Sequence, residues 1–156
     1  MYNDYEFIYP YYRLLEAGAE VLVVGPEAGR VYHGKAGTTA RSTASALEVE
    51  PADFAGLVIP GGYAPDMMRR HEAMVNLVRE MDRQGKVVAA ICHAGWMLAS
   101  AKILQGRTVT SFFAIKDDLI HAGATWIDRE VVEDGRLITS RTPDDLPVFM
   151  RTVVRA

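Results

Sequence analysis

The strongest constraint on the fold is Val87–Ile91, a run of five apolar residues that lies between two segments with helical patterns. A continuous apolar run of this length is typical of a strand that is buried on both faces of a sheet. Similar short runs alternate with amphipathic segments along the chain. This alternation favours an α/β fold in which a mostly parallel sheet is covered by helices on both faces.

The apolar periodicity and the Gly and Pro signals predict the following elements. Helices are expected over Glu6–Glu16, His71–Gln84, Ala94–Lys102, Ile115–His121 and from Asp144 or Asp145 through Val154, with Pro10 better suited to a first turn. Strands are expected over Glu20–Val24, Leu57–Ile59, Val87–Ile91, Arg107–Thr110, Thr125–Val132 and Arg136–Ser140. Arg30–Glu50 is expected to be an irregular segment with short strands.

The 156 residues are enough for one domain with a sizeable core, and we expect a single domain over residues 1–156. The net charge is −3, and acidic and basic residues are interspersed, so the sequence shows no basic patch of the kind that binds nucleic acid. One cysteine cannot form an internal disulfide, and the cysteine spacing of zinc sites is absent. We therefore expect the protein to be located in a reducing cytoplasm. No apolar run approaches about 18 residues, and the amino end lacks a signal pattern.

Ligands of parallel α/β folds bind at the carboxyl ends of the strands. Pro60-Gly61-Gly62, Cys92-His93 and the segment before Glu6 all fall at such ends. The chain opens on a loop and a helix, without the strand that usually precedes them. Three explanations stay open for this first strand: a trimmed sequence, a misassigned start, or another segment that fills its place.

Cys92 follows a predicted strand and opens a predicted helix. Unpaired N–H groups and the positive end of the helix dipole at that junction favour the thiolate, so Cys92 is predicted to be a nucleophile. The alternative is a small buried hydrophobe. His93 comes next, and on a helical turn the two side chains are expected to diverge. His93 is therefore a candidate proton shuttle or source of positive charge, rather than automatically the base.

Glu6 at a helix start is explained either by the dipole alone or by burial against the sulfur. In the second case burial favours the protonated form, which donates a hydrogen bond to the thiolate. Gly61-Gly62 is either a tight turn or a place of close approach, where the Gly62 and His93 N–H groups form an oxyanion hole. His33, His71 and His121 have no metal spacing and are expected to be solvated.

Several segments together resemble the ThiJ/PfpI superfamily, in its branch of PfpI-type intracellular proteases and deglycases. The matching pieces are Glu6–Tyr11, Val58–Pro65, Ala90–Gly95, Ile115–Asp118 and Thr139–Asp144, which span the chain in order. The resemblance implies a flavodoxin-like three-layer sandwich with a nucleophilic cysteine on an elbow, which is Cys92 here. It also implies that Glu6 touches the sulfur and that His93 is the branch's histidine.

In that branch an acidic residue from a neighbouring subunit contacts the histidine, and here its position is Asp66. The resemblance therefore implies a homo-oligomer, a dimer or hexamer. A second glutamate often stands three residues before the first, whereas this chain has Asn3.

The leading hypothesis is a cysteine-dependent hydrolase or lyase that acts on a carbonyl group of a peptide, a small aldehyde or a glycated side chain. Cys92 attacks, Gly62 and His93 amides hold the oxyanion, and Glu6, His93 and Asp66 move protons. The alternative is a non-enzymatic redox or stress protein that senses oxidation at Cys92. A glutaminase domain ranks low, because no His-x-Glu pair follows Cys92. Nothing in the sequence indicates a cofactor, a metal, a nucleic-acid partner or a membrane.

Overall fold

The computed structural model describes residues 1–156. The helices are α1 (Asp4–Glu16), α2 (Ala64–Met68), α3 (Glu72–Arg83), α4 (Gly95–Ala101), α5 (Lys116–His121) and α6 (Leu146–Arg155). The strands are β1 (Val24–Gly25), β2 (Val31–His33), β3 (Thr39–Arg41), β4 (Ala44–Ser45), β5 (Gly56–Ile59), β6 (Val87–Ile91), β7 (Thr108–Val109), β8 (Thr125–Trp126), β9 (Val131–Asp134) and β10 (Leu137–Ser140).

The central sheet has the strand order β5-β6-β10-β9. Strands β5 and β10 both run parallel to β6, and β9 is antiparallel to β10 across the predicted turn at Asp134-Gly135. Two further parallel pairs, β1–β4 and β7–β8, and the antiparallel pair β2–β3 lie outside this sheet. The expected α/β fold with a mostly parallel sheet is confirmed.

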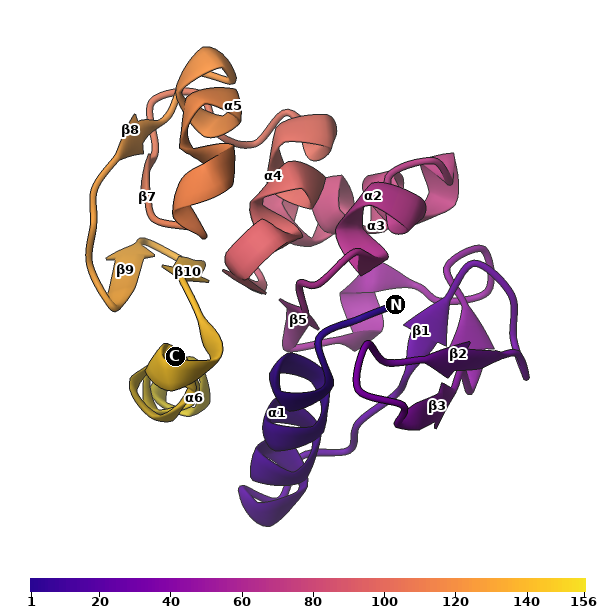
Figure 1. Ribbon diagram of the computed structural model, residues 1–156. Helices are drawn as coiled ribbons and strands as arrows, with labels where there is room; N and C mark the ends of the chain where they lie inside the picture. Colours follow the sequence, from indigo (N-terminus) through magenta and orange to yellow (C-terminus); the bar gives the residue numbers. More distant parts are fainter.

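Helices cover both faces of the central sheet (Figure 1). The side chains of β6 alternate between two cores, as strand geometry requires. Val88 and Ala90 pack in a core with residues of α3, α4 and α5, whereas Val87, Ala89 and Ile91 pack in a second core with α6. Helix α1 packs beside α6. The helices and the sheet therefore form three layers. Cys92 follows directly after the carboxyl end of β6, at the carboxyl edge of the sheet.

Three strand and helix predictions differ from the structure. The strand expected over Glu20–Val24 pairs only at Val24–Gly25, because β4 is its single neighbour. The strand expected over Thr125–Val132 is two strands, since β8 pairs with β7 and β9 pairs with β10. The segment that holds Met67, where no helix was predicted, forms the short helix α2.

Helix ends also depart from expectation at two positions. Pro10 lies in the middle of α1, where the helix lacks the N–H that would reach the Glu6 carbonyl. Asp145 stands at the start of α6 but does not cap it. Its carboxylate instead pairs with Arg141 at 2.9 Å, and Arg141 also pairs with Asp128. None of the helices is long and apolar enough to cross a bilayer.

Phe149 on α6 is the largest fully buried side chain and fills the core between α6 and β6. Replacing Phe149 with Ala is expected to lower the free energy of unfolding by about 3–5 kcal/mol, because the truncation leaves a cavity in a rigid core. Phe113→Ala is the matched control, since Phe113 is 71% exposed, and it should change stability by less than about 0.5 kcal/mol. Urea unfolding of both variants measures the difference. Equal effects would contradict the packing described here.

Candidate active site

Cys92 lies on a sharp turn between β6 and α4. The preceding residue, Ile91, has an extended backbone, and Cys92 has a φ of +62°. The other non-glycine residue with positive φ, Lys102, simply ends α4. A left-handed conformation at a side-chain-bearing residue costs about 1–3 kcal/mol and is concentrated at functional sites. The turn places the thiol at the carboxyl edge of the sheet, and the residue is 8% exposed.

Glu6 reaches this edge from the first turn of α1. Asn3 caps the helix, and its side chain accepts hydrogen bonds from the N–H groups of Tyr5 and Glu6. The carboxyl of Glu6 is fully buried, and Oε2 accepts a hydrogen bond of 2.7 Å from the Gly61 N–H. Oε1 accepts no hydrogen bond, and the neighbouring Cys92 thiol is one of the groups that act on the pKa of the carboxyl.

Gly61 lies between the two reactive groups. A Cβ at this position would be 2.5 Å from Glu6 Oε2, 2.8 Å from the Cys92 Cβ and 3.0 Å from the Ile91 carbonyl oxygen. Each distance is shorter than ordinary contact, and the last two atoms cannot move without moving the strand. Only glycine therefore lets the carboxyl approach the thiol across the loop, so the Pro-Gly-Gly motif is more than a turn.

Burial and the adjacent thiol set the charge of the pair. Burial raises the pKa of Glu6 to about 7, although the Gly61 N–H, Cys92 and the positive charge of Lys35 oppose the rise. Burial, followed by the negative charge of Glu6, raises the pKa of Cys92 to about 12. The two groups therefore do not carry negative charges together, and a proton on Glu6 removes the charge that opposes the thiolate.

The N–H groups of the elbow act on the thiol in the predicted direction, but the expectation that they leave the thiol anionic is wrong. The backbone N–H groups of His93 and Gly62 do direct hydrogen bonds at the sulfur and favour the thiolate. Burial and the Glu6 charge outweigh them, because a desolvated anion next to a carboxylate is costly.

The prediction that the Cys92 and His93 side chains diverge is also wrong. His93 Nδ1 lies 3.3 Å from Cys92 Sγ. The expectation assumed helical backbone at both residues, whereas Cys92 is left-handed. The half-buried imidazole stacks on Phe112 and meets the edge of Trp96, with centroid distances of 5.0 and 5.2 Å. Burial, then the charge of Lys35, lowers the pKa of His93, so the ring is neutral near pH 7.

Asp66 is not brought to His93 within one chain. It lies in the first turn of α2, is partly exposed and forms an ion pair with Arg70. The other histidines, His33, His71 and His121, are exposed. Of the residues that sequence reasoning proposed, the structure thus gathers Cys92, His93, Glu6, Gly61 and Gly62 at one point and leaves Asp66 apart.

The sequence analysis missed two residues near the site, Asp4 and Lys35. The buried carboxylate of Asp4 accepts hydrogen bonds from the N–H groups of Ala36 and Thr38 and from the Thr38 hydroxyl, which lowers its pKa to about 2. This contact fixes the loop that carries Lys35 against α1. The Lys35 ammonium lies 4.9 Å from the centre of the Tyr63 ring. The one sequence signal for this contact was the position of Asp4 directly after the helix cap Asn3. That position did not show which loop the Asp4 carboxylate would bind.

The electrostatic coupling predicts that Glu6→Gln speeds alkylation of the thiol at pH 8–9. Burial, the larger cause of the raised pKa of Cys92, remains in the variant, but the substitution removes the second cause, the Glu6 charge. Each unit of lowered pKa gives about tenfold more thiolate. The rate of iodoacetamide modification against pH measures this. Glu16→Gln, the same change at an exposed residue of α1, should leave the profile unaltered. A Glu6→Gln profile that matches the wild type would show that the carboxylate does not act on the sulfur.

The raised pKa of Glu6 also predicts how stability changes with pH. Between pH 4.5, its ordinary pKa, and about 7 the folded state binds the proton more tightly than the unfolded state. Stability from this residue is therefore present below pH 4.5 and is lost as pH rises to 7, by about 3 kcal/mol. Urea unfolding across this range should show the loss in the wild type relative to Glu6→Gln. Parallel curves would contradict a buried, proton-binding Glu6.

Comparison with known proteins gives a consistent result. The DJ-1/PfpI family matches residues 1–156. Deglycase PfpI of Pyrococcus furiosus is 47% identical over 154 residues, which cover 99% of this chain and 92% of that protein. Protein/nucleic acid deglycase 2 of Escherichia coli is 40% identical over 156 residues, which cover 99% of this chain and 91% of that protein.

A solved structure agrees with the fold. It is a two-domain protein from Anabaena variabilis with a DJ-1/ThiJ/PfpI-like and a ferritin-like domain, and it superposes with a TM-score of 0.97 at 41% identity. The match covers 99% of this chain and 44% of that protein. The family match over the whole sequence agrees with the fold and with the motifs on which the resemblance rests. The close relatives agree with them as well. The chain therefore belongs to the DJ-1/PfpI family.

Proposed function

We propose that the protein is a cysteine-dependent deglycase-type hydrolase that acts on small carbonyl groups, namely a 2-oxoaldehyde or its adduct on an amine. The observation that carries the proposal is the buried Glu6 carboxyl beside the Cys92 thiol, with two N–H groups directed at the same sulfur. The relatives named deglycase support this class. A thiol that is 8% exposed on an edge suits a small carbonyl better than the backbone of a peptide.

The first step is addition of sulfur to the carbonyl carbon. The thiol proton moves to Glu6, the carbon–sulfur bond forms, and the π electrons of the carbonyl move to its oxygen. The Gly62 and His93 N–H groups hold that oxygen, and each such donor accounts for about 3 kcal/mol of barrier in acyl-transfer enzymes. Glu6, with a pKa near 7, can then return the proton to the oxygen.

For a 2-oxoaldehyde, the adduct then rearranges to a thioester. The proton on the sulfur-bearing carbon moves to the neighbouring carbonyl carbon, and the hydroxyl proton of the sulfur-bearing carbon moves to the oxygen of that carbonyl. Neutral His93, 3.3 Å from the sulfur, is the base placed to take that proton and later to activate water. Water cleaves the thioester and restores the thiol. The sum is one aldehyde and one water converted to one 2-hydroxy acid, with no external oxidant or cofactor.

Cys92→Ala is expected to abolish conversion of methylglyoxal to lactate, by at least about a hundredfold in kcat/KM, because no other thiol exists in the chain. Lactate formation is the readout, and unfolding curves establish that the variant is folded. Release of free amine from a glycated peptide, measured in parallel, separates deglycase from glyoxalase activity. Wild-type protein without turnover, together with stable addition of two oxygens at Cys92 under mild peroxide, would favour the redox-sensor alternative instead.

We further propose that Asp66 of a second copy completes the site by contacting His93, as the family resemblance implies. Asp66→Asn should then lower kcat, and Cys92→Ala should have no activity. Mixing the two variants should restore activity above that of Asp66→Asn alone, because one site of a mixed oligomer receives both intact residues. Arg70→Gln, which breaks only the ion pair of Asp66, is the control. Activity of the mixture equal to the sum of its parts would contradict a shared site.

A further inference from the structure

Lys35 is a cation beside the candidate site that has no acidic partner. It is exposed, and it takes part in none of the ion pairs of the structure, whereas seven arginines do. Its ammonium lies 4.9 Å from the centre of the Tyr63 ring, and Tyr63 is itself 59% exposed. An unpaired ammonium at this place is free to bind an anion that enters the site.

The backbone brings the loop of Lys35 close to the loop that carries Gly62. Tyr2 forms a β-bridge to Gly34 on one side and a second β-bridge to Gly62 on the other. Neighbouring strands lie about 4.8 Å apart, so the two glycines are about 10 Å apart. The Lys35 N–H donates to the Tyr2 carbonyl at 2.9 Å. From there the lysine side chain reaches the ring of Tyr63, the residue that follows Gly62.

Asp4 holds the loop of Lys35 in place. Its carboxylate is 7% exposed and accepts hydrogen bonds from the N–H groups of Ala36 and Thr38 and from the Thr38 hydroxyl. A Cβ at Gly34 would overlap this carboxylate, so the approach requires glycine. The backbone on both sides of Lys35 is therefore fixed by buried contacts, and the position of the lysine does not depend on its exposed side chain.

The positive charge of Lys35 reaches both ionisable groups that flank the Cys92 sulfur. Burial raises the pKa of Glu6 to about 7, and the charge of Lys35 opposes the rise. Burial also lowers the pKa of His93, and the charge of Lys35 adds to that effect. An ammonium that acts on both groups also acts on a ligand bound between them.

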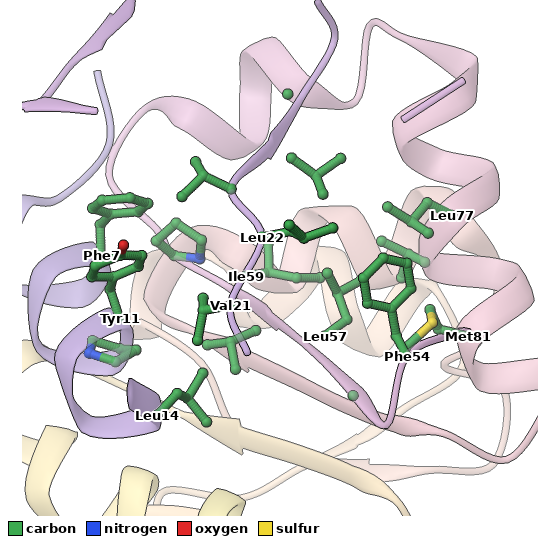
Figure 2. Close-up of a pocket in the computed structure, with 18 of the residues that line it drawn as sticks. Phe7, Tyr11, Leu14, Val21, Leu22, Phe54, Leu57, Ile59, Leu77 and Met81 are labelled. Atoms are coloured by element: carbon green, nitrogen blue, oxygen red, sulfur yellow. The ribbon is translucent and has the colours of Figure 1, made fainter. Parts of the chain in front are cut away.

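Other surfaces near the site are apolar. Phe112 and Trp96 pack on the imidazole of His93. A cavity of about 1070 Å³, which Glu6 and Tyr63 also line, has mainly apolar walls (Figure 2). Among the labelled side chains of that cavity are Phe7, Leu14, Leu57 and Leu77. Because a carboxylate without a partner is costly against such walls, a negative group on a bound substrate is best placed beside the Lys35 ammonium.

We propose that Lys35 is a specificity-determining residue, which holds a carboxylate at the far end of a 2-oxoaldehyde substrate, away from the carbonyl carbon that Cys92 attacks. The reaction itself is that of the proposed function, on which this inference rests. One ammonium matches the single charge of a carboxylate, and the nearby carboxyl groups of Asp4 and Glu6 disfavour a more highly charged group. The product is a 2-hydroxy dicarboxylate, formed from one aldehyde and one water.

Alkylation of the thiol by two reagents of similar shape tests the cation without any turnover. Iodoacetate carries a carboxylate where iodoacetamide carries a neutral amide. Both react with the Cys92 thiolate, so the ratio of their rates does not depend on the thiolate fraction. Lys35→Met removes the charge and should lower the ratio of the iodoacetate rate to the iodoacetamide rate by about fivefold, the effect of one exposed ion pair. An unchanged ratio would overturn the proposal.

Two control variants and salt separate the charge from damage to the loop. Lys35→Arg keeps the charge and should keep the ratio within about twofold. Lys86→Met removes a lysine that precedes β6, at the opposite end of the strand from Cys92, and should not change the ratio. At about 1 M NaCl the Debye length is about 3 Å, so the wild-type ratio should fall towards that of Lys35→Met. A ratio that Lys35→Arg lowers as much as Lys35→Met would contradict a role for the charge.

Substrate preference is measured with a matched pair of 2-oxoaldehydes. One has a carboxyethyl group on its ketone carbon, and the other has an isopentyl group, in which isopropyl takes the place of the carboxylate. Wild-type protein should have the higher kcat/KM for the anionic aldehyde. Lys35→Met should lower that kcat/KM by about fivefold, mainly through KM, and change the value for the neutral aldehyde by less than about twofold. Equal losses for both aldehydes would overturn the specificity role.

The two proposals fail in different ways. If wild-type protein converts neither aldehyde but its alkylation ratio depends on Lys35, the proposed function is wrong and the anion site is supported. If wild-type protein converts both aldehydes and neither the alkylation ratio nor the substrate preference depends on Lys35, the anion site is wrong and the proposed function stands.

Discussion

The candidate site depends on one carboxyl group that is held away from water between a helix and a loop. Glu6 is fully buried, and its position is fixed from both sides: Asn3 caps the helix that carries it, and the Gly61 N–H binds Oε2. The absence of a side chain at Gly61 is what lets the carboxyl and the thiol meet. The elbow, the Pro-Gly-Gly loop and the start of α1 are thus parts of one contact.

This contact determines the chemistry of the sulfur more than the helix start does. Burial penalises a charge on either group, and a charge on one penalises a charge on the other, so the two groups do not both carry a negative charge. The Gly62 and His93 N–H groups favour a negative charge on the sulfur. The neutral imidazole of His93 beside the sulfur adds a base without adding charge. The arrangement therefore suits a nucleophile that is formed by proton transfer when the substrate arrives.

The sequence predicted best where one local pattern has a single physical outcome. Val87–Ile91 is apolar at every position, and a strand buried on both faces is the structure that satisfies it. Predictions failed where the outcome depended on a neighbour. Glu20–Val24 has a strand pattern, yet it pairs over two residues because one of its edges has no partner. Asp144 or Asp145 was expected to cap α6, but the Asp145 carboxylate pairs with the Arg141 guanidinium of the preceding loop, and no side chain caps the helix.

The sequence by itself determined the alternation of strands and helices and the place of Cys92 at a strand-to-helix junction. Both follow from apolar periodicity, which acts over neighbouring residues. Only the tertiary structure decided that the His93 ring lies on the sulfur, that Glu6 holds a proton near neutrality, and that Asp4 anchors the loop of Lys35. These outcomes depend on burial and on contacts between residues far apart in the chain, and no local pattern encodes how much water a given side chain will lose.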